Sequence, residues 1–325
     1  MITRTDVDDA GRRIATHVRR TPTLALDGAT VLKLELTQHT GSFKPRGAFN
    51  DVLSRASLPA SGITAASGGN HGQAVAYVAS RLGLKAEVFV PEVCPTVKRE
   101  RIAGFGAVIV VGGAIYDDAQ AACTARAALT GAHLVHPFDR DEVMAGAGTV
   151  ALELAEDDPD LDTVLVAVGG GGLLGGTLAF YGRDVRVVAV EPERSQALHA
   201  ALDAGRPVEV GVDGAAADSL GARQIGERPF ELASAHLYRS ITVSDAAIVT
   251  AQRRLWESVR IMAEPGGAAA FAALLSGAYR RGPGERVGII VCGGNVDPAS
   301  VTPPGSASTG SGPPGGASDT GTVPA

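Results

Sequence analysis

The chain has 325 residues, enough to bury a large core and to form two domains. Hydrophobic residues make up 45% of it and aromatic residues 4%, and the formal net charge is −6, which is typical of a globular protein and unlike a nucleic-acid-binding surface. Because no apolar stretch is long enough to span a membrane and the N-terminus lacks the apolar core of a signal peptide, we expect a cytoplasmic protein with neither a nucleic-acid nor a membrane partner.

Short apolar runs alternate with helical stretches along most of the chain. The runs predicted as strands are 31–36, 63–67, 85–91, 107–113, 133–137, 163–168, 185–192 and 287–294. The run 107–113 is predicted to be buried. This alternation predicts an α/β fold, in which mostly parallel sheets carry helices on both faces. Residues 301–325 are rich in Pro, Gly, Ser and Thr, so we expect a disordered tail and no regulatory domain after it.

Four of the predicted strands are followed by unusual loops. These loops are 37–50 (TQHTGSFKPRGAFN), 67–72 (SGGNHG), 169–172 (GGGG) and 292–295 (CGGN). Three of them are rich in glycine, which lets backbone N–H groups approach a ligand closely. Because a parallel sheet binds its ligands at the carboxyl ends of its strands, the four loops indicate a binding crevice.

Lys44 is the lysine with the most informative position. It lies just past a strand end, among small residues, whereas Lys33, Lys85 and Lys98 have the surroundings of solvent-exposed side chains. A lysine in a crevice pairs with an anion or, when its pKa is lowered, forms a Schiff base. The local sequence leaves open the alternative that Lys44 is also a surface lysine.

The strand at 163–168 runs into four consecutive glycines, an arrangement that usually binds a phosphate. Gly170, Gly172 and Gly175 match the dinucleotide fingerprint, and Glu191 lies where a ribose-binding acid is expected. An NAD-dependent oxidoreductase is therefore an alternative. Against it, the glycine loop follows about 160 residues of α/β chain, whereas that fingerprint usually opens the first βαβ unit.

Cysteine and histidine usage does not indicate a metal site. Cys94, Cys123 and Cys292 are far apart, and the sequence contains neither a CxxC pair nor an HExxH motif. His133 and His136 lie in a predicted strand and are expected to be packing or surface residues rather than metal ligands.

The motifs TGSFKPRGA, SGGNHGQA, GGGG, AEPGGA and CGGN resemble, in order and spacing, those of the fold-type-II (tryptophan-synthase-β-like) pyridoxal-phosphate enzymes. Within that family the chain is most similar to the serine/threonine dehydratases (threonine ammonia-lyases) and to serine racemases, over about residues 5–300. The resemblance implies two domains, each a mostly parallel twisted sheet flanked by helices, with pyridoxal 5′-phosphate in the crevice between them. It implies a large domain of 1–50 plus 140–300 and a small substrate-loop domain of 51–139.

The resemblance also implies roles for the matching residues. Lys44 would hold the cofactor as a Schiff base and later move the α-proton, with Phe43 near the cofactor ring. Asn70 would hydrogen-bond the phenolic oxygen of the ring, Cys292 would lie beside the pyridine nitrogen, and Glu264 would lie near the cofactor. The cofactor phosphate would be held by Gly169, Gly170, Gly171, Gly172 and Leu173, and the substrate carboxylate by the backbone N–H groups of Ser67, Gly68, Gly69, Asn70 and His71.

The lysine and substrate-loop motifs favour the dehydratase branch of the family. That branch implies β-elimination from L-threonine or L-serine, giving 2-oxobutanoate or pyruvate plus ammonia. Racemases carry a serine where this chain has Gly68, which favours net elimination, although a serine racemase and a 3-hydroxyaspartate dehydratase remain alternatives. The resemblance also implies a homodimer or homotetramer. Some relatives bind a monovalent or divalent cation; Asp213 and Asp218 are the candidate ligands here, and Asp218 is the better of the two.

Overall fold

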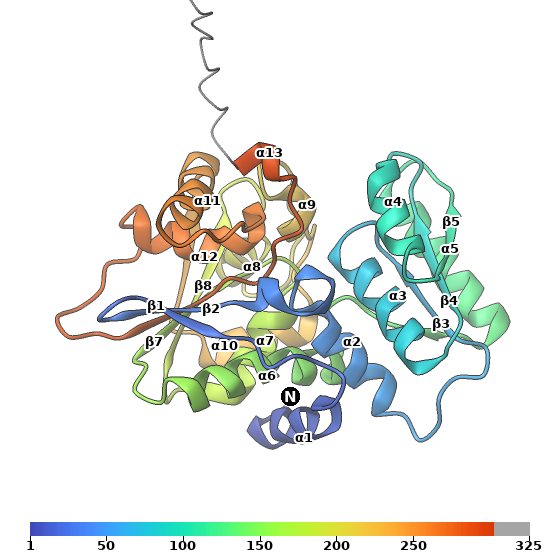
Figure 1. Ribbon diagram of the computed structural model, residues 1–325, viewed down its shortest axis with the longest axis horizontal. Helices are drawn as coiled ribbons and strands as arrows, with labels where there is room; N and C mark the ends of the chain where they lie inside the picture. Colours follow the sequence, from blue (N-terminus) through green and yellow to red (C-terminus); the bar gives the residue numbers. More distant parts are fainter. Residues whose placement is uncertain (302–325) are drawn as a thin grey trace, which may run out of the picture.

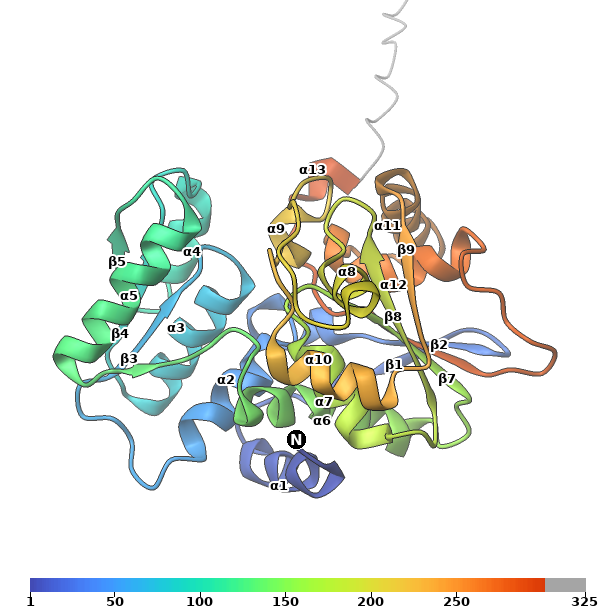
Figure 2. The ribbon, with the colours of Figure 1, turned by 180° about the vertical axis from the view of Figure 1, so that it is seen from behind.

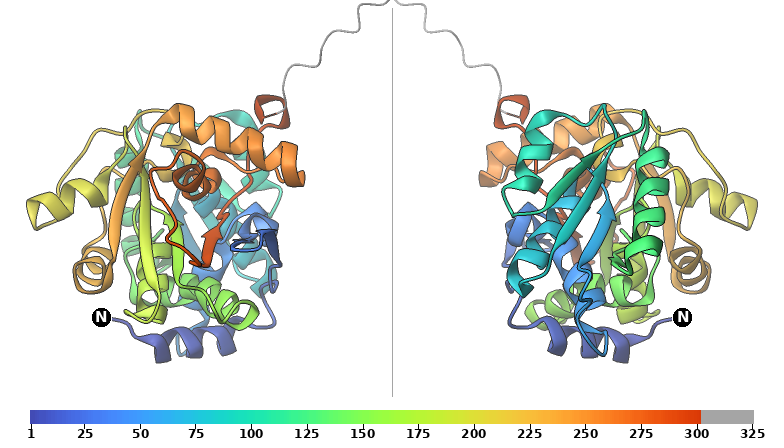
Figure 3. Two further views of the ribbon diagram at one scale, coloured as in Figure 1. Left: turned by 90° about the vertical axis from the view of Figure 1, so that its left-hand side faces the viewer. Right: turned by 90° about the vertical axis from the view of Figure 1, so that its right-hand side faces the viewer.

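The structure is a computed structural model that describes residues 1–301. The chain forms two lobes, each built around one β-sheet, and the lobes lie side by side (Figures 1 and 2). We call them the large lobe, around a six-stranded sheet, and the small lobe, around a four-stranded sheet; Figure 3 views each of them end on. Apart from Val301, the predicted tail of residues 301–325 lies outside the described residues.

The large sheet is parallel except at one edge. In spatial order its strands are β1 (Thr23–Asp27), β2 (Thr30–Lys33), β10 (Val287–Ile290), β7 (Thr163–Ala167), β8 (Arg186–Pro192) and β9 (Arg239–Val243). Strands β1 and β2 pair antiparallel, and the other neighbours pair parallel. The inner strands β2, β10 and β7 are buried along their whole length, as expected for a parallel sheet that is covered on both faces. The edge strands β1 and β9 were not predicted, because they are partly exposed and lack a continuous apolar run.

Helices cover both faces of the large sheet (Figure 1). On one side lie α1 (Arg4–Ile14), α6 (Asp141–Asp157), α7 (Gly172–Tyr181) and α10 (Glu227–His236), and on the other α11 (Asp245–Val259) and α12 (Pro265–Leu275). The connections contain η1 (Glu35–Thr37), η2 (His39–Gly41), α8 (Ala197–Ala204) and α9 (Ala217–Leu220), and α13 (Pro298–Val301) follows β10. Helices α6 and α7 approach closely because glycines face each other; a Cβ on Gly148 would meet the carbonyl oxygen of Gly176 at 2.7 Å. Within residues 1–301, no helix combines the length and the apolar character needed to cross a membrane.

The small sheet is parallel throughout. Its strands, in spatial order, are β5 (Val108–Val111), β4 (Ala86–Val90), β3 (Ile63–Ala66) and β6 (His133–Leu134). Helices α3 (Asn70–Leu82) and α4 (Thr96–Ala103) pack on one face, and α5 (Tyr116–Thr130) packs on the other. The α/β fold class predicted from the sequence is confirmed.

The predicted burial of residues 107–113 is wrong. Strand β5 is the edge strand of the small sheet, and the side chains of Val108 and Val111 are 60% and 44% exposed. An apolar run identifies a strand but does not distinguish a central position from an edge, where one side of the strand has no neighbour.

Helix α2 (Lys44–Leu53) lies between the two lobes and packs on α6 of one lobe and α3 of the other. The loop expected over 37–50 therefore ends at Phe43, and its second half is helical. Pro45 lies in the first turn of α2, where proline is favoured because its missing N–H would have no partner there.

Charged side chains are buried where α2 joins the large lobe. We call this group the Arg46 cluster; its members are Thr21, Lys33, Glu35, Arg46, Thr149 and Glu153. Arg46 is fully buried, and its Nε and Nη2 donate to the two carboxylate oxygens of Glu35 at 2.8 Å each. Its Nη1 and Nη2 donate to Glu153 at 2.7 and 2.8 Å. Such two-pronged pairing satisfies both carboxylates, and it raises the pKa of Arg46 despite the opposing effect of burial.

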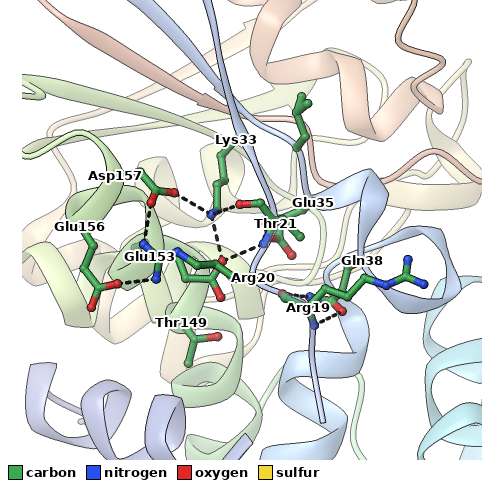
Figure 4. Close-up of polar contacts among 12 residues, drawn as sticks. Arg19, Arg20, Thr21, Lys33, Glu35, Gln38, Thr149, Glu153, Glu156 and Asp157 are labelled. Carbon is green, nitrogen blue, oxygen red and sulfur yellow. Dashed lines mark hydrogen bonds and ion pairs between the residues drawn. The ribbon is translucent and has the colours of Figure 1, made fainter. Parts of the chain in front are cut away.

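The solvent exposure predicted for Lys33 is wrong. Its side chain is 0% exposed, and its Nζ donates to Glu153 Oε2 at 2.9 Å and to the carbonyl oxygen of Thr21 at 2.7 Å (Figure 4). Asp157 Oδ2 lies 3.4 Å from the same nitrogen. The cost of burying this ammonium is offset by carboxylates on α6, more than 100 residues away in the sequence.

Candidate active site

The segment that carries Lys44 is tied to the segment that follows β10. The backbone turns at Thr40 and Gly41, which have φ of 62° and 73°, and Ser42 then forms an antiparallel bridge with Gly293. The N–H of Phe43 donates to the carbonyl oxygen of Cys292 at 3.1 Å. Two loops that the sequence places at separate strand ends therefore run side by side.

Lys44 has a low-dielectric environment around its amine. Its Nζ donates to the carbonyl oxygen of Pro137 at 2.8 Å and lies 5.1 Å from the centre of the Phe43 ring. Burial lowers the pKa of Lys44 to about 8. At pH 7 about a tenth of such an amine is neutral, which is a far larger fraction than for an ordinary lysine.

The glycine loop begins where β7 ends and leads directly into α7. Gly171 has a φ of +92°, which side chains other than glycine rarely adopt. The ring of Phe138 packs so closely against Gly170 that a Cβ there would clash with it. In the described part of the chain, the N–H groups of Gly169 to Gly172 donate to no protein acceptor, and they lie where the helix dipole favours an anion.

Substitution of Gly171 by alanine is expected to destabilise the fold by roughly 3 kcal/mol or more, because strain at positive φ adds to overpacking. A Cβ at this position would meet Ile225 Cδ1 and Pro229 Cβ at 2.6 Å. Gly205 is the matched control, since it has a φ of +68° but, apart from its chain neighbours, no atom of the described residues within 4 Å of the place that a Cβ would take. Gly205→Ala is expected to cost only about 1–2 kcal/mol. Urea unfolding measures both, and equal costs would contradict the close packing of the glycine loop.

The loop at 67–71 connects β3 to α3. The N–H of Ser67 donates to the carbonyl oxygen of Phe89 at 3.1 Å, and the N–H of Gly69 donates to Ser67 Oγ at 3.2 Å. The His71 ring points into the protein, with Nε2 2.9 Å from the carbonyl oxygen of Val135, and burial lowers its pKa to about 3. At the start of α3 it is therefore the backbone, and not the imidazole of His71, that faces the segment carrying Lys44.

Asn70, Glu264 and Asn295 form a hydrogen-bonded group that joins the two lobes. Asn70 Nδ2 donates to Glu264 Oε1 at 2.6 Å, and Asn295 Nδ2 donates to Asn70 Oδ1 at 2.7 Å. Glu264 is 6% exposed, and burial raises its pKa to about 7 although the Asn70 hydrogen bond opposes the shift. This group brings together three of the motifs that the sequence singles out, SGGNHGQA, AEPGGA and CGGN.

Cys292 lies at the end of β10 and is fully enclosed. Its Sγ contacts the carbonyl oxygen of Gly266 at 3.6 Å, and burial raises the pKa of this thiol to about 12. Cys292 is therefore a neutral thiol at physiological pH. The carbonyl oxygen of Cys292 accepts the N–H of Phe43, so Cys292 lies beside the segment that carries Lys44.

Two other predicted residues have partners of their own. The Asp218 side chain is 84% exposed and pairs with Lys98 at 3.0 Å. Among the described residues, no group of three His, Cys, Asp or Glu side chains could hold a metal ion. Glu191 is fully buried, and its two oxygens accept the N–H groups of Leu198 and His199 at 2.8 Å each, so it caps α8 and is not available to a ribose.

Three contributors were not identified from the sequence. Pro137 and Phe138 connect Lys44 to the glycine loop, because the first accepts a hydrogen bond from Lys44 and the second packs on Gly170. Asn295 belongs to a motif that the sequence singles out, but no role was assigned to it. The one signal in the sequence for Pro137 and Phe138 is that the predicted strand 133–137 ends there, at an edge where ligands bind.

Comparisons with known proteins agree with this geometry. Residues 14–293 match the model of the family described as pyridoxal-phosphate dependent enzyme. The chain is 39% identical over 277 residues to L-threonine dehydratase biosynthetic IlvA of Escherichia coli, covering 84% of this chain but only 54%, about half, of that protein. It is 35% identical to an L-threonine ammonia-lyase of Thermotoga maritima, covering 91% of this chain and 76% of the relative. The structure of maize serine racemase superposes with a TM-score of 0.86 at 31% identity, over 92% of this chain and 95% of the other. The chain therefore belongs to the family of pyridoxal-phosphate-dependent enzymes.

Proposed function

We propose that the protein is a pyridoxal-phosphate-dependent ammonia-lyase that acts on L-threonine or L-serine. The observation that carries the proposal is the partly buried Lys44, which lies in one region with the glycine loop and the Asn70–Glu264–Asn295 group. Relatives named L-threonine dehydratase and L-threonine ammonia-lyase support the same class of reaction.

The residues around Lys44 fit the cofactor of the family. Its amine has a pKa of about 8 and is thus suited to Schiff-base formation. The N–H groups of Gly169 to Gly172, which have no protein acceptor among the described residues, suit a phosphate at the start of α7. The neutral thiol of Cys292 suits an unprotonated pyridine nitrogen.

Each residue then contributes a defined step. Bound pyridoxal phosphate would supply an electron sink for the substrate α-carbon. The α-proton and the Cβ hydroxyl would be lost together as one water molecule, and a water molecule taken up afterwards would release the nitrogen as ammonia. Lys44 removes the α-proton as general base. The N–H groups at the start of α3 bind the substrate carboxylate. Because Cys292 does not hold a proton on the ring nitrogen, it favours elimination over transamination.

A serine racemase is the second candidate, supported by the structural match to the maize enzyme. Gly68 argues against it, because glycine has no side chain to deliver a proton to the other face of the α-carbon. A Cβ at Gly68 would also lie 2.5 Å from Cys94 Sγ. A 3-hydroxyaspartate dehydratase would catalyse the same reaction on a substrate that differs from L-threonine and L-serine in the group attached to Cβ.

We also propose the division into a large domain of 1–50 plus 140–300 and a small domain of 51–139; the two sheets of the fold support it. The cytoplasmic location, the homodimer or homotetramer and a cation near Asp218 stay predictions. The small-molecule substrate is proposed to be a β-hydroxy amino acid.

A substrate panel tests the proposed function. The protein, loaded with pyridoxal phosphate, is incubated with L-threonine, L-serine or threo-3-hydroxyaspartate, and the keto acid is measured by its enzymatic reduction. L-Alanine, which lacks a Cβ hydroxyl, is the control. We expect 2-oxobutanoate from L-threonine and pyruvate from L-serine. Conversion of L-serine to D-serine without keto acid would favour the racemase, and no turnover of any hydroxy amino acid would contradict the proposal.

The lowered pKa of Lys44 predicts an unusual pH dependence for cofactor attachment. Only the neutral amine attacks an aldehyde, so the rate of Schiff-base formation should rise up to about pH 8 and then level off. With an ordinary lysine, the rate of Schiff-base formation would keep rising up to about pH 10.4. Absorbance of the cofactor-free protein mixed with pyridoxal phosphate measures the rate, and a Lys44→Arg variant corrects for other lysines. A continued rise of about tenfold per pH unit above about pH 8.5 would contradict the desolvated environment.

A further inference from the structure

Asn295 uses both of its N–H groups inside the protein. Its Nδ2 donates to the carbonyl oxygen of Thr40 at 2.7 Å and to Asn70 Oδ1 at 2.7 Å. Gly41, with its φ of +73°, makes room for this amide, because a Cβ there would lie 2.6 Å from Asn295 Oδ1. The turn that precedes Lys44 is thus shaped to admit Asn295.

These bonds allow only one orientation of the Asn70 amide. As placed, its oxygen faces the donor of Asn295 and its nitrogen faces the carboxylate of Glu264. If the amide were turned over, two N–H groups would face each other on one side and two acceptor oxygens on the other. Each mismatched pair leaves half-buried polar groups without a partner, which costs free energy.

The fixed orientation leaves one donor for a ligand. One N–H of Asn70 Nδ2 is used by Glu264, and the other makes no hydrogen bond within residues 1–301. Asn70 begins α3 in the small lobe, whereas Thr40, Glu264 and Asn295 belong to the large lobe. The donor is therefore oriented only while the two lobes are in contact.

We propose that Asn295 is a positioning residue, which holds the Asn70 amide so that its remaining N–H points at an oxygen of the bound cofactor. This inference rests on the proposed function, because the oxygen belongs to pyridoxal phosphate. Without Asn295 the Asn70 amide can rotate, and with an acceptor at position 295 it is turned the wrong way.

The test compares Asn295→Ala and Asn295→Asp in the pyridoxal-phosphate-loaded protein. The readouts are the absorption spectrum of the bound cofactor, the pKa of its Schiff base, and kcat and KM separately. We expect a shifted Schiff-base pKa and a fall in kcat of about tenfold, the size expected when one hydrogen bond to a charged oxygen is lost, with Asp the more severe. The effect should disappear in an Asn70→Ala background, since Asn295 acts through Asn70.

Asn50→Asp is the matched control. Asn50 is a buried asparagine that, like Asn295, donates from its Nδ2 to a carbonyl oxygen, here that of Glu142 at 2.7 Å. We expect it to lower stability without moving the spectrum. An unchanged spectrum in both Asn295 variants, or an effect that adds fully to that of Asn70→Ala, would overturn the inference. If the unmutated protein binds no chromophore, the proposed function itself fails, which is a separate result.

Discussion

Replacing Lys44 by alanine is expected to lower the rate of keto-acid formation at least about a thousandfold, because the change removes both the Schiff-base amine and the general base. The fold should persist, since within residues 1–301 the Lys44 Nζ makes one hydrogen bond, to Pro137. Borohydride reduction of the unmutated protein should attach the cofactor to the peptide that contains Lys44, which mass spectrometry detects.

Lys85→Ala is the control for this experiment, because Lys85 is exposed and precedes β4. That variant should keep both the absorbance of the bound cofactor and its activity. A Lys44→Ala protein that still traps the cofactor on borohydride treatment, or that keeps a tenth of the activity, would show that another lysine holds the cofactor.

Arg46→Met is expected to destabilise the protein by about 3–5 kcal/mol, the cost of leaving buried carboxylates without their partner. Glu35 and Glu153 each accept two hydrogen bonds from Arg46, and Glu35 is fully buried. Urea unfolding measures the loss. Neutralising one of the stranded carboxylates in Arg46→Met/Glu35→Gln should recover part of it.

Arg20→Met is the matched control for the buried arginine. Arg20 also pairs with two carboxylates, those of Glu156 and Asp157 at 2.6 Å each, but its side chain is 51% exposed. Its replacement should cost less than about 1 kcal/mol, as for other exposed ion pairs. Similar losses in the two variants would show that burial does not govern the strength of the Arg46 pairs.

The sequence predicts the strand-end loops well because one rule of parallel sheets applies to all of them. Lys44, the glycine loop and Cys292 follow strands in the sequence, so the edge of the sheet on which they lie could be predicted. The close pairing of Ser42 with Gly293 could not, because spatial order in a sheet is not written in chain order.

Long-range charge pairing limits what local patterns reveal. Lys33 has the appearance of an exposed strand lysine, and the carboxylates of Glu153 and Asp157, far along the chain, offset the free-energy cost of its burial. Asn295 is similar, since its partner Asn70 lies 225 residues away. In both cases, side chains that the sequence separates widely satisfy each other only after folding.

The Arg46 cluster also constrains how this sequence can change over time. Its members come from the N-terminal arm, β2, η1, α2 and α6, and each charged member depends on at least one other. A substitution at one position strands a buried charge, and a second substitution elsewhere is needed to relieve it. Accepted changes at Lys33, Glu35, Arg46 and Glu153 are therefore expected to occur in pairs. This dependence between positions restricts sequence change at the start of the helix that carries Lys44.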